Sequence, residues 1–290
     1  MTRSQKALLL HSAGETYTLV KCHEVPALVH SNEILIKVAA VGLNPVDWKA
    51  LPCSRIQLGD VVLVPSTDYR DIRKAAFQDV AYIAAALALG VCFSLDFSAA
   101  VAAPGPNLTC TLVEIDKSTI PDDIIAIWGA SAATGYITTQ LAKQYGLKVI
   151  CVADISRHSR ILQGAGADVL VDRFDMTRAI DTIRGVTGGC PRYVLDMEAL
   201  CTDPDGPQAH HLGLTERPKD QHSRICYHAV PIKLFHICEP AAEQLMRWLE
   251  RLLESEALIP PGLIVRGEGL AGVNDALKML RDASALNMRI

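Results

Sequence analysis

The chain has 290 residues, of which 50% are apolar and 21% are charged, and its formal net charge is −4. This composition excludes a disordered chain, and the slightly acidic balance does not favour nucleic acid or an anionic membrane surface as a partner. At roughly 100–200 residues per domain, the length suggests two domains. No apolar run reaches the ~18 residues of a membrane span, and the N-terminal apolar patch is too short for a secretory signal, so we expect a cytoplasmic protein.

Cysteine and histidine are scattered along the chain. The nine cysteines are odd in number and show no CxxC spacing, which favours reduced, mostly buried thiols over a disulfide framework or a structural zinc site. His210 and His211 are adjacent, in a polar stretch that also contains proline. We interpret that stretch as a solvated loop rather than as a metal site.

The first hundred residues predict short strands. Residues 6–11, 16–21, 33–41 and 61–64 are apolar or alternating runs separated by Gly, Pro and Asn, and the apolar run 81–89 fits a strand or a helix. Short strands with this punctuation are typical of an all-β, barrel-like unit.

The character of the sequence changes near residue 120. Residues 124–128 form an apolar run of strand length, which is followed by the small-residue stretch GASAATG, a helical stretch ended by Gly146, and a second apolar run over 148–153. The order strand, turn, helix, strand is that of a βαβ unit.

The same alternation repeats further along the chain. Residues 168–172 and 192–197 predict strands, and SRHSRILQGAGA and TRAIDTIRGVTGG predict the helices that precede them. Buried strands alternating with helices predict a doubly wound parallel sheet. The alternation stops after Met197, and residues 198–238 receive no assignment. Beyond them we predict a packing helix (PAAEQLMRWLERLLES), a strand (LIVRGEG) and a final helix (GVNDALKMLRDA).

The strongest chemical signal is the turn from Gly129 to Gly135. It follows an apolar strand and opens a helix, so its small residues would let the backbone approach a pyrophosphate, and the helix N-terminus would offer free N–H groups. Ser131 and Thr134 add hydroxyl donors. The spacing departs from a strict GxGxxG, because Ser131 replaces the second glycine and Gly135 comes one position late. The alternative is a structural turn that binds no ligand.

Two signals after the second strand of this unit point to different nucleotides. Asp154 lies where an acidic residue would accept a hydrogen bond from a ribose 2′-hydroxyl, which favours NADH. Ser156, Arg157 and His158 follow at once, and a hydroxyl, a guanidinium and an imidazole suit the 2′-phosphate of NADPH. A further alternative is that Asp154 caps the next helix.

Five segments, taken together and in order, resemble the medium-chain dehydrogenase/reductase superfamily. They are GLNPVDWK, IQLGDVV, TGYITTQLAKQYGLKVI, GAGADVLVDR and GGCPRYVLDM. The resemblance is strongest to the zinc-independent branch, which contains quinone reductases and the trans-acting enoyl reductases of fungal polyketide pathways. It covers residues 1–50, 56–200 and roughly 240–290.

The resemblance implies an α/β chain with a GroES-like β-barrel domain and a Rossmann domain that holds the doubly wound parallel sheet. The barrel domain, shortened here, would span residues 1–115 and be completed by 258–290, and the Rossmann domain would span 116–257. The resemblance also implies an NADPH-dependent oxidoreductase that reduces an activated C=C, with an enoyl thioester of polyketide or other secondary-metabolite biosynthesis as acceptor. NADH is the alternative cofactor, and a quinone or a free enone is the alternative acceptor.

Carried over by position, the resemblance assigns two sets of contacts. The cofactor would be bound from the barrel by Val46, Asp47, Trp48 and Lys49, at the pyrophosphate turn by Ser131, Ala132, Ala133 and Thr134, at the 2′-phosphate by Ile155, Ser156, Arg157 and His158, and at the adenosine by Arg173. The acyl pocket would be lined by Gly105, Pro106, Asn107, Leu108, Thr109, Cys110, Thr111 and Leu112. No residue is assigned as the catalytic proton donor.

The chain also departs from its relatives. The cysteine that zinc-dependent relatives carry at the position of Asn44 is missing, as is their Gly-His-Glu, so we expect no catalytic metal. Only ALPCSR fills the place of a strand–turn–strand stretch before Ile56, and residues 198–238 show no convincing equivalent of the continuing sheet. These departures predict an impaired enzyme or, alternatively, a degenerate protein that binds a dinucleotide without catalysis. A tethered substrate would bring a carrier protein or a polyketide synthase as partner, and the chain would be a monomer or a homodimer.

Overall fold

The computed structural model describes residues 4–9, 11, 16–27, 37, 123–189, 191–195, 209–213, 223, 225–229, 248, 251–260 and 268–281. Contacts divide the chain into two compact units, of which one holds Met1–Ala86 with Gly262–Ile290 and the other holds Leu87–Pro261. The domain boundaries after residues 115 and 257 stay a prediction.

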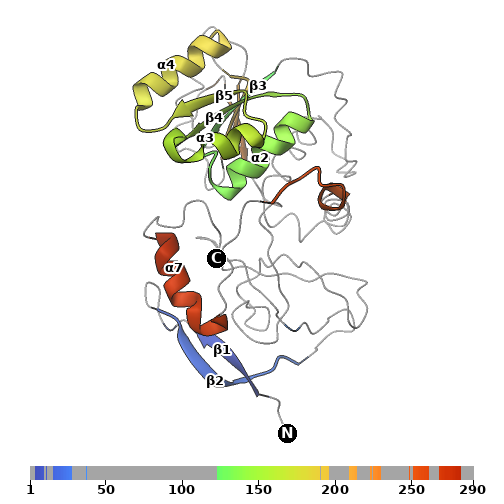
Figure 1. The fold of residues 1–290 in the computed structure, drawn as a ribbon, viewed down its shortest axis with the longest axis vertical. Helices are drawn as coiled ribbons and strands as arrows, with labels where there is room; N and C mark the ends of the chain where they lie inside the picture. The colour runs from blue at the N-terminus through green and yellow to red at the C-terminus, as the bar shows by residue number, and fades with distance from the viewer. Residues whose placement is uncertain are drawn as a thin grey trace. The chain divides into compact units, whose positions relative to one another are not determined.

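In the first unit, strands β1 (Ser4–Leu9) and β2 (Thr18–Glu24) form a 2-stranded antiparallel sheet. The sequence predicts both strands, shifted by a few residues. The C-terminal part of the chain adds the 3-10 helix η3 (Gly269–Gly272) and helix α7 (Val273–Arg281), as labelled for α7 in Figure 1. The prediction of a final helix from GVNDALKMLRDA is therefore confirmed.

Helix α7 packs on the N-terminal strands through apolar and polar contacts. Leu8 forms a small buried core with Val273 and Ala276. The main-chain N–H of Tyr17 donates to Oδ1 of Asn274 at 2.9 Å, and Nδ2 of Asn274 donates to the carbonyl of Tyr17 at 2.8 Å. One side chain thus binds both the main-chain N–H and the main-chain carbonyl of Tyr17.

The second unit contains a 6-stranded sheet in the order β5-β4-β3-β6-β7-β8, and every neighbouring pair is parallel. The strands are β3 (Ile124–Trp128), β4 (Lys148–Ala153), β5 (Val169–Asp172), β6 (Tyr193–Leu195), β7 (Ala209–Gly213) and β8 (Ile225–Ala229). Counted from β3, this is the order 3-2-1-4-5-6 of the doubly wound dinucleotide-binding fold. The predicted doubly wound parallel sheet is confirmed.

Within residues 123–195 the strands alternate with helices, as the sequence predicts (Figure 1). The helices are α2 (Ala133–Gln144), α3 (Ile155–Gly164) and α4 (Met176–Thr187). Helix α4 shows how the sequence sets their ends: the carboxylate of Asp175 accepts from the N–H of Arg178 at 3.0 Å, and Gly188 ends the helix in the left-handed conformation.

The central strands are buried on both faces. One face packs against α4, in a core that contains Ala126, Ile150, Val152, Val171, Ala179, Ile183, Val194, Ala209 and Ile225. On the other face, Oγ1 of Thr139 in α2 lies 3.3 Å from Sγ of Cys151 in β4. Burial on both faces is the reason why these strands are continuous apolar runs in the sequence.

The sheet extends beyond the point where the sequence pattern stops. Strands β7 and β8 continue it within residues 198–238, so our expectation of no equivalent there was wrong. His211 lies in β7 and is 6% exposed, so the interpretation of the histidine pair as a solvated loop was also wrong. The ring of His210 lies 5.4 Å from that of Tyr193, and the ring of His211 lies 5.6 Å from that of Tyr227. Here aromatic contacts between neighbouring strands take the place of the aliphatic side-chain pairs by which a buried strand is usually identified in a sequence.

Residues 251–260, which come just before the end of the second unit, are hydrogen-bonded to α2. Residues 251–254 are helical, within the predicted packing helix. The side chain of Gln140 donates to the carbonyl of Ile259 at 2.9 Å and accepts from its N–H at 2.8 Å, and Gln144 donates to the carbonyl of Ala257 at 2.5 Å. These bonds hold the chain on α2 just before it leaves the unit at Pro261.

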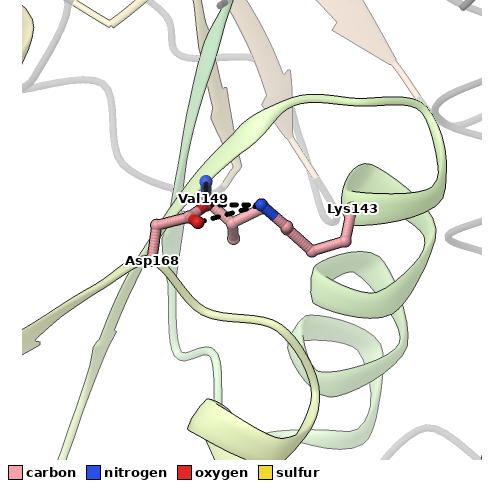
Figure 2. Close-up of polar contacts among 3 residues, drawn as sticks. All are labelled: Lys143, Val149 and Asp168. Atoms are coloured by element: carbon pink, nitrogen blue, oxygen red, sulfur yellow. Dashed lines mark hydrogen bonds and ion pairs between the residues drawn. The ribbon is translucent and has the colours of Figure 1, made fainter.

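Figure 2 shows a polar contact that joins α2, β4 and the start of β5. The carboxylate of Asp168 accepts from Nζ of Lys143 at 2.9 Å and from the N–H of Val149 at 2.7 Å. We expect Asp168→Ala to lower the free energy of unfolding by about 1 kcal/mol, because it leaves the Val149 amide without its acceptor. Lys143→Met, which keeps the aliphatic stem, should cost less than about 0.5 kcal/mol, since the ion pair is partly exposed. Urea denaturation measures both losses, and equal losses would contradict this assignment.

Candidate functional site

Loops from three neighbouring strands meet at the carboxyl edge of the sheet, because parallel strands all end at the same edge. Main-chain hydrogen bonds tie the loops together. The N–H of Ala130, after β3, donates to the carbonyl of Val152 at 3.1 Å, and the N–H of Arg173, after β5, donates to the carbonyl of Ala153 at 3.0 Å. Ligands of such sheets bind at this edge where the strand order reverses, which here is beside β3.

The turn after β3 depends on two glycines. Gly129 has a φ of +71°, which disfavours other residues, and its carbonyl accepts from the N–H of Ala132 at 2.9 Å. A Cβ added to Gly135 would lie 2.6 Å from Cα of Ala130 and 2.6 Å from the carbonyl oxygen of Gly129. Glycine at position 135 therefore lets the first turn of α2 rest directly against the end of β3.

The N-terminus of α2 has no side-chain cap. Ala132 is the N-cap residue and cannot accept through its side chain, while its carbonyl accepts from the N–H of Tyr136 at 2.8 Å. The first turn of α2 therefore has N–H groups that no N-cap side chain accepts from. Uncapped amides at the positive end of a helix dipole bind anions.

The structure places the four predicted pyrophosphate residues together in this turn. Ser131 and Thr134 are half-buried, and Ala132 is exposed. Ala133 begins α2. Their contact with a pyrophosphate stays a prediction, which the geometry of the turn permits.

Asp154, Ser156 and Arg157 form a polar cluster at the N-terminus of α3. The hydroxyl of Ser156 donates to Oδ1 of Asp154 at 2.5 Å, and Nε of Arg157 lies 3.4 Å from Oδ2. Asp154 is the N-cap residue of α3, as the alternative interpretation expects, and its main-chain carbonyl accepts from the N–H of His158 at 3.0 Å, although its side chain makes no capping bond. The hydrogen bond from Ser156 holds the pKa of Asp154 below its ordinary value, which keeps this carboxylate ionised at neutral pH.

His158 differs from its neighbours in the predicted 2′-phosphate loop. Its side chain is buried, with the residue 2% exposed, whereas Ser156 and Arg157 are exposed and Ile155 is half-buried. Burial lowers the pKa of His158; the negative charge of Asp154 opposes this, and the charges of Arg157 and Arg173 add to it. A buried neutral imidazole offers no charge to a phosphate, so Ser156 and Arg157 are the stronger candidates for that contact.

The burial of His158 predicts a loss of stability in mild acid. Because its pKa in the folded chain is below the ordinary value of 6.5, the unfolded chain takes up the proton at a higher pH than the folded chain does. The contribution of His158 to folding stability is complete above the ordinary pKa of 6.5, and it is lost as pH falls through the lower pKa of the folded chain. Burial also lowers the pKa of His210, so this residue contributes to the same loss of stability. Urea denaturation at a series of pH values should show this decline, and His158→Gln should make it shallower; an unchanged slope would contradict the assignment.

Arg173 and Phe174 follow β5 at the same edge. The guanidinium of Arg173 lies over the Phe174 ring, 5.1 Å from its centroid, and Phe174 is 69% exposed. The N–H of Phe174 donates to Oδ1 of Asp172 at 3.1 Å. An exposed ring beside a guanidinium is a flat surface on which an aromatic base can stack. Sequence reasoning selected Arg173 and missed Phe174, although an aromatic residue directly after a strand end was a usable signal.

The remaining predicted contacts lie outside the described residues. These are the barrel-side residues 46–49 and the acyl-pocket residues 105–112. In the described part of the chain, no group of three His, Cys, Asp or Glu side chains is placed to hold a metal ion. None of the helices in the described residues has the length and apolar character needed to cross a membrane. The expectation of no catalytic metal stays a prediction.

The described cysteines are free thiols: Cys22, Cys151 and Cys226. Burial raises the pKa of Cys151 to about 11, so its thiol stays protonated at neutral pH. The prediction of reduced, mostly buried thiols stays a prediction. Of the three described cysteines, Cys151 is buried in the core between β4 and α2, whereas Cys22 is exposed.

The chain is similar in sequence to the trans-enoyl reductase ACTTS2 of Alternaria alternata. The two are 29% identical over 233 residues, which are 67% of this chain and 65% of that protein. The chain thus spans somewhat less than two thirds of the length of this relative. No protein-family model matches the chain.

Solved structures share the fold over almost the whole chain. A mycobacterial protein, Rv1454c, solved in complex with NADPH, matches with a TM-score of 0.67 at 17% identity, over 99% of each chain. The CurK enoyl reductase matches with a TM-score of 0.66 at 13% identity, over 99% of this chain and 98% of its own. The shared fold confirms the predicted fold class. The similarity to a trans-enoyl reductase agrees with the branch that the sequence resembles.

Proposed function

We propose that the chain is an NADPH-dependent oxidoreductase that reduces an activated C=C, with an enoyl thioester as its favoured acceptor. The observation that carries the proposal is the uncapped N-terminus of α2, held against the end of β3 by Gly135. The similarity to a trans-enoyl reductase supports the acceptor, and the shared fold with a protein solved in complex with NADPH supports the cofactor. The thioester would reach the site as a small molecule or on a carrier protein.

The described residues fit NADPH in three places. The amides at the start of α2, with the hydroxyls of Ser131 and Thr134, would bind the pyrophosphate. Ser156 and Arg157 would bind the 2′-phosphate, and the stacked pair that follows β5 would support the adenine. These places lie at the ends of β3, β4 and β5, which are neighbours in the sheet.

The bound nucleotide supplies the hydride, and the chain binds and orients it. At the turn after β3, no side chain caps the N-terminus of α2, so its amides can face the pyrophosphate. The turn from Gly129 to Gly135 would hold the nucleotide in one position. Hydride transfer between two bound molecules requires such a fixed position. The barrel-side contacts of residues 46–49 and the acyl pocket of residues 105–112 belong to the same proposal and rest on the family resemblance.

Nucleotide titration followed by a turnover assay tests the proposal. Trp128 directly precedes the turn, so quenching of tryptophan emission reports binding, and Trp128→Phe identifies its share of the signal. We expect NADPH to bind, and to be oxidised faster with an α,β-unsaturated thioester than with a quinone, with or without a chelator. Faster oxidation with the quinone would favour the alternative acceptor. Binding without turnover would indicate a non-catalytic dinucleotide-binding protein, and no binding of either nucleotide would refute the proposal.

A further inference from the structure

Helix α2 contains two adjacent threonines whose side chains are enclosed by the fold. Thr138 is 1% exposed, and Thr139 is fully buried. Their hydroxyls donate to the carbonyls of Thr134 and Gly135, four residues earlier, at 2.8 and 2.9 Å. These carbonyls already accept main-chain N–H groups within the helix, and hydroxyl bonds of this kind slightly destabilise helices. A valine would fill the same space without a polar group to satisfy, so the two hydroxyls need another explanation.

The hydroxyl of Thr138 acts on an amide in the first turn of α2. The Thr134 carbonyl, to which it donates, belongs to the same peptide group as the N–H of Gly135. Resonance couples the two ends of a peptide group, so a hydrogen bond to its oxygen makes its N–H a stronger donor. Gly135 is the third residue of α2, where the amide has no intrahelical acceptor. An N-cap side chain often accepts from this amide, but the N-cap residue here is Ala132.

We propose that Thr138 is a positioning residue for the nucleotide, because its hydroxyl holds and polarises the peptide group whose N–H, that of Gly135, donates to the pyrophosphate. Thr138 would act through this peptide group and not by contact with the ligand, since its side chain is enclosed. The inference rests on the proposed function and deepens it at the same turn.

Thr139 makes the same kind of bond to a different peptide group. The Gly135 carbonyl, which accepts its hydroxyl, shares a peptide group with the N–H of Tyr136. That N–H already donates to the carbonyl of Ala132 at 2.8 Å, so it is not available to an anion. Oγ1 of Thr139 also lies 3.3 Å from Sγ of Cys151, and the thiol is the donor there, because the single hydroxyl hydrogen goes to Gly135. Thr139 therefore joins α2 to β4, and it provides the matched control for Thr138.

The decisive variant is Thr138→Val, which keeps the shape of the side chain and removes the hydroxyl. We expect the full-length variant to bind NADPH and NADH each about threefold more weakly, because one donor to the shared pyrophosphate loses its polarising bond. Thr138→Ser keeps the hydroxyl and should retain the affinity of the wild type. Thr139→Val should change neither dissociation constant by more than about 1.5-fold, although it leaves the Cys151 thiol without its acceptor and lowers stability. Fluorescence titration measures the affinities, and urea denaturation measures the stabilities.

A measurement on the ligand-free chain separates polarisation of the amide from a general loss of stability. A polarised N–H has a deshielded proton, so the amide proton of Gly135 should move to lower chemical shift in Thr138→Val. It should keep its position in Thr138→Ser. Nuclear magnetic resonance of the full-length chain with isotope-labelled glycine makes this measurement without any nucleotide.

Several outcomes would overturn the inference. They are an NADPH affinity that is unchanged in Thr138→Val, an equal loss of affinity in Thr139→Val, and a Gly135 amide signal that does not move in Thr138→Val. If Thr138→Val does not fold, as judged by circular dichroism, Thr138→Ala is measured with the same expectations. A wild type that binds neither nucleotide refutes the proposed function, whereas a wild type that binds NADPH no more tightly than Thr138→Val refutes only the role of Thr138.

Discussion

Gly135→Ala should abolish NADPH binding and lower the free energy of unfolding by about 2–3 kcal/mol. The added Cβ would lie 2.6 Å from Cα of Ala130 and 2.6 Å from the carbonyl oxygen of Gly129. Both are main-chain atoms in the turn, so no flexible side-chain end can move aside. Helix α2 would have to shift away from the end of β3, which would displace the amides that face the pyrophosphate.

Gly185→Ala is the matched control for this variant. Gly185 lies inside α4, and an added Cβ there has no atom within 4 Å. Alanine is favoured over glycine inside a helix by roughly 0.5–1 kcal/mol, so this variant should be as stable as the wild type or more stable, with an unchanged NADPH affinity. Urea denaturation and nucleotide titration compare the two. If the two variants have the same stability and the same NADPH affinity, the close approach of α2 to β3 is not needed for folding or for nucleotide binding.

Ser131→Leu should weaken NADPH binding at least tenfold, or roughly 1.4 kcal/mol. Ser131 is half-buried in the turn that precedes α2, and a bulky side chain there would keep the pyrophosphate away from the amides. The pyrophosphate is common to both nucleotides, so NADPH and NADH should lose affinity equally. This separates the effect from Arg157→Ala, which should weaken NADPH far more than NADH because only NADPH carries the 2′-phosphate.

Ser131→Ala controls for the loss of the hydroxyl, because it removes that group without adding bulk. If Ser131→Ala loses much less NADPH affinity than Ser131→Leu does, the close approach of the backbone to the pyrophosphate matters more than a hydrogen bond from the Ser131 hydroxyl. Fluorescence titration of both variants, with a denaturation curve to confirm folding, makes the measurement. A dissociation constant in Ser131→Leu equal to that of the wild type would show that the turn has a structural role only.

Much of the second unit was predictable from local patterns. Residues 124–128 and 148–153 are continuous apolar runs because both faces of their strands are covered, and the small-residue turn between them is the one place where a βαβ unit admits an anion. Strands β7 and β8 were missed for a related reason. His210 and His211 pack against tyrosine rings of neighbouring strands, and a histidine pair has no periodicity that distinguishes a buried strand from a polar loop.

Local sequence specifies the alternation of strands and helices and the position of the turn after β3, because these depend on residues that are close together in the chain. The tertiary structure alone decided how the side chains at the sheet edge are used. His158 is buried while Arg157 is exposed, and Asp154 turns to Ser156 and Arg157 instead of the helix amides. Which side chains meet at that edge depends on how α3 packs on the sheet, and that packing is set by residues far apart in the chain.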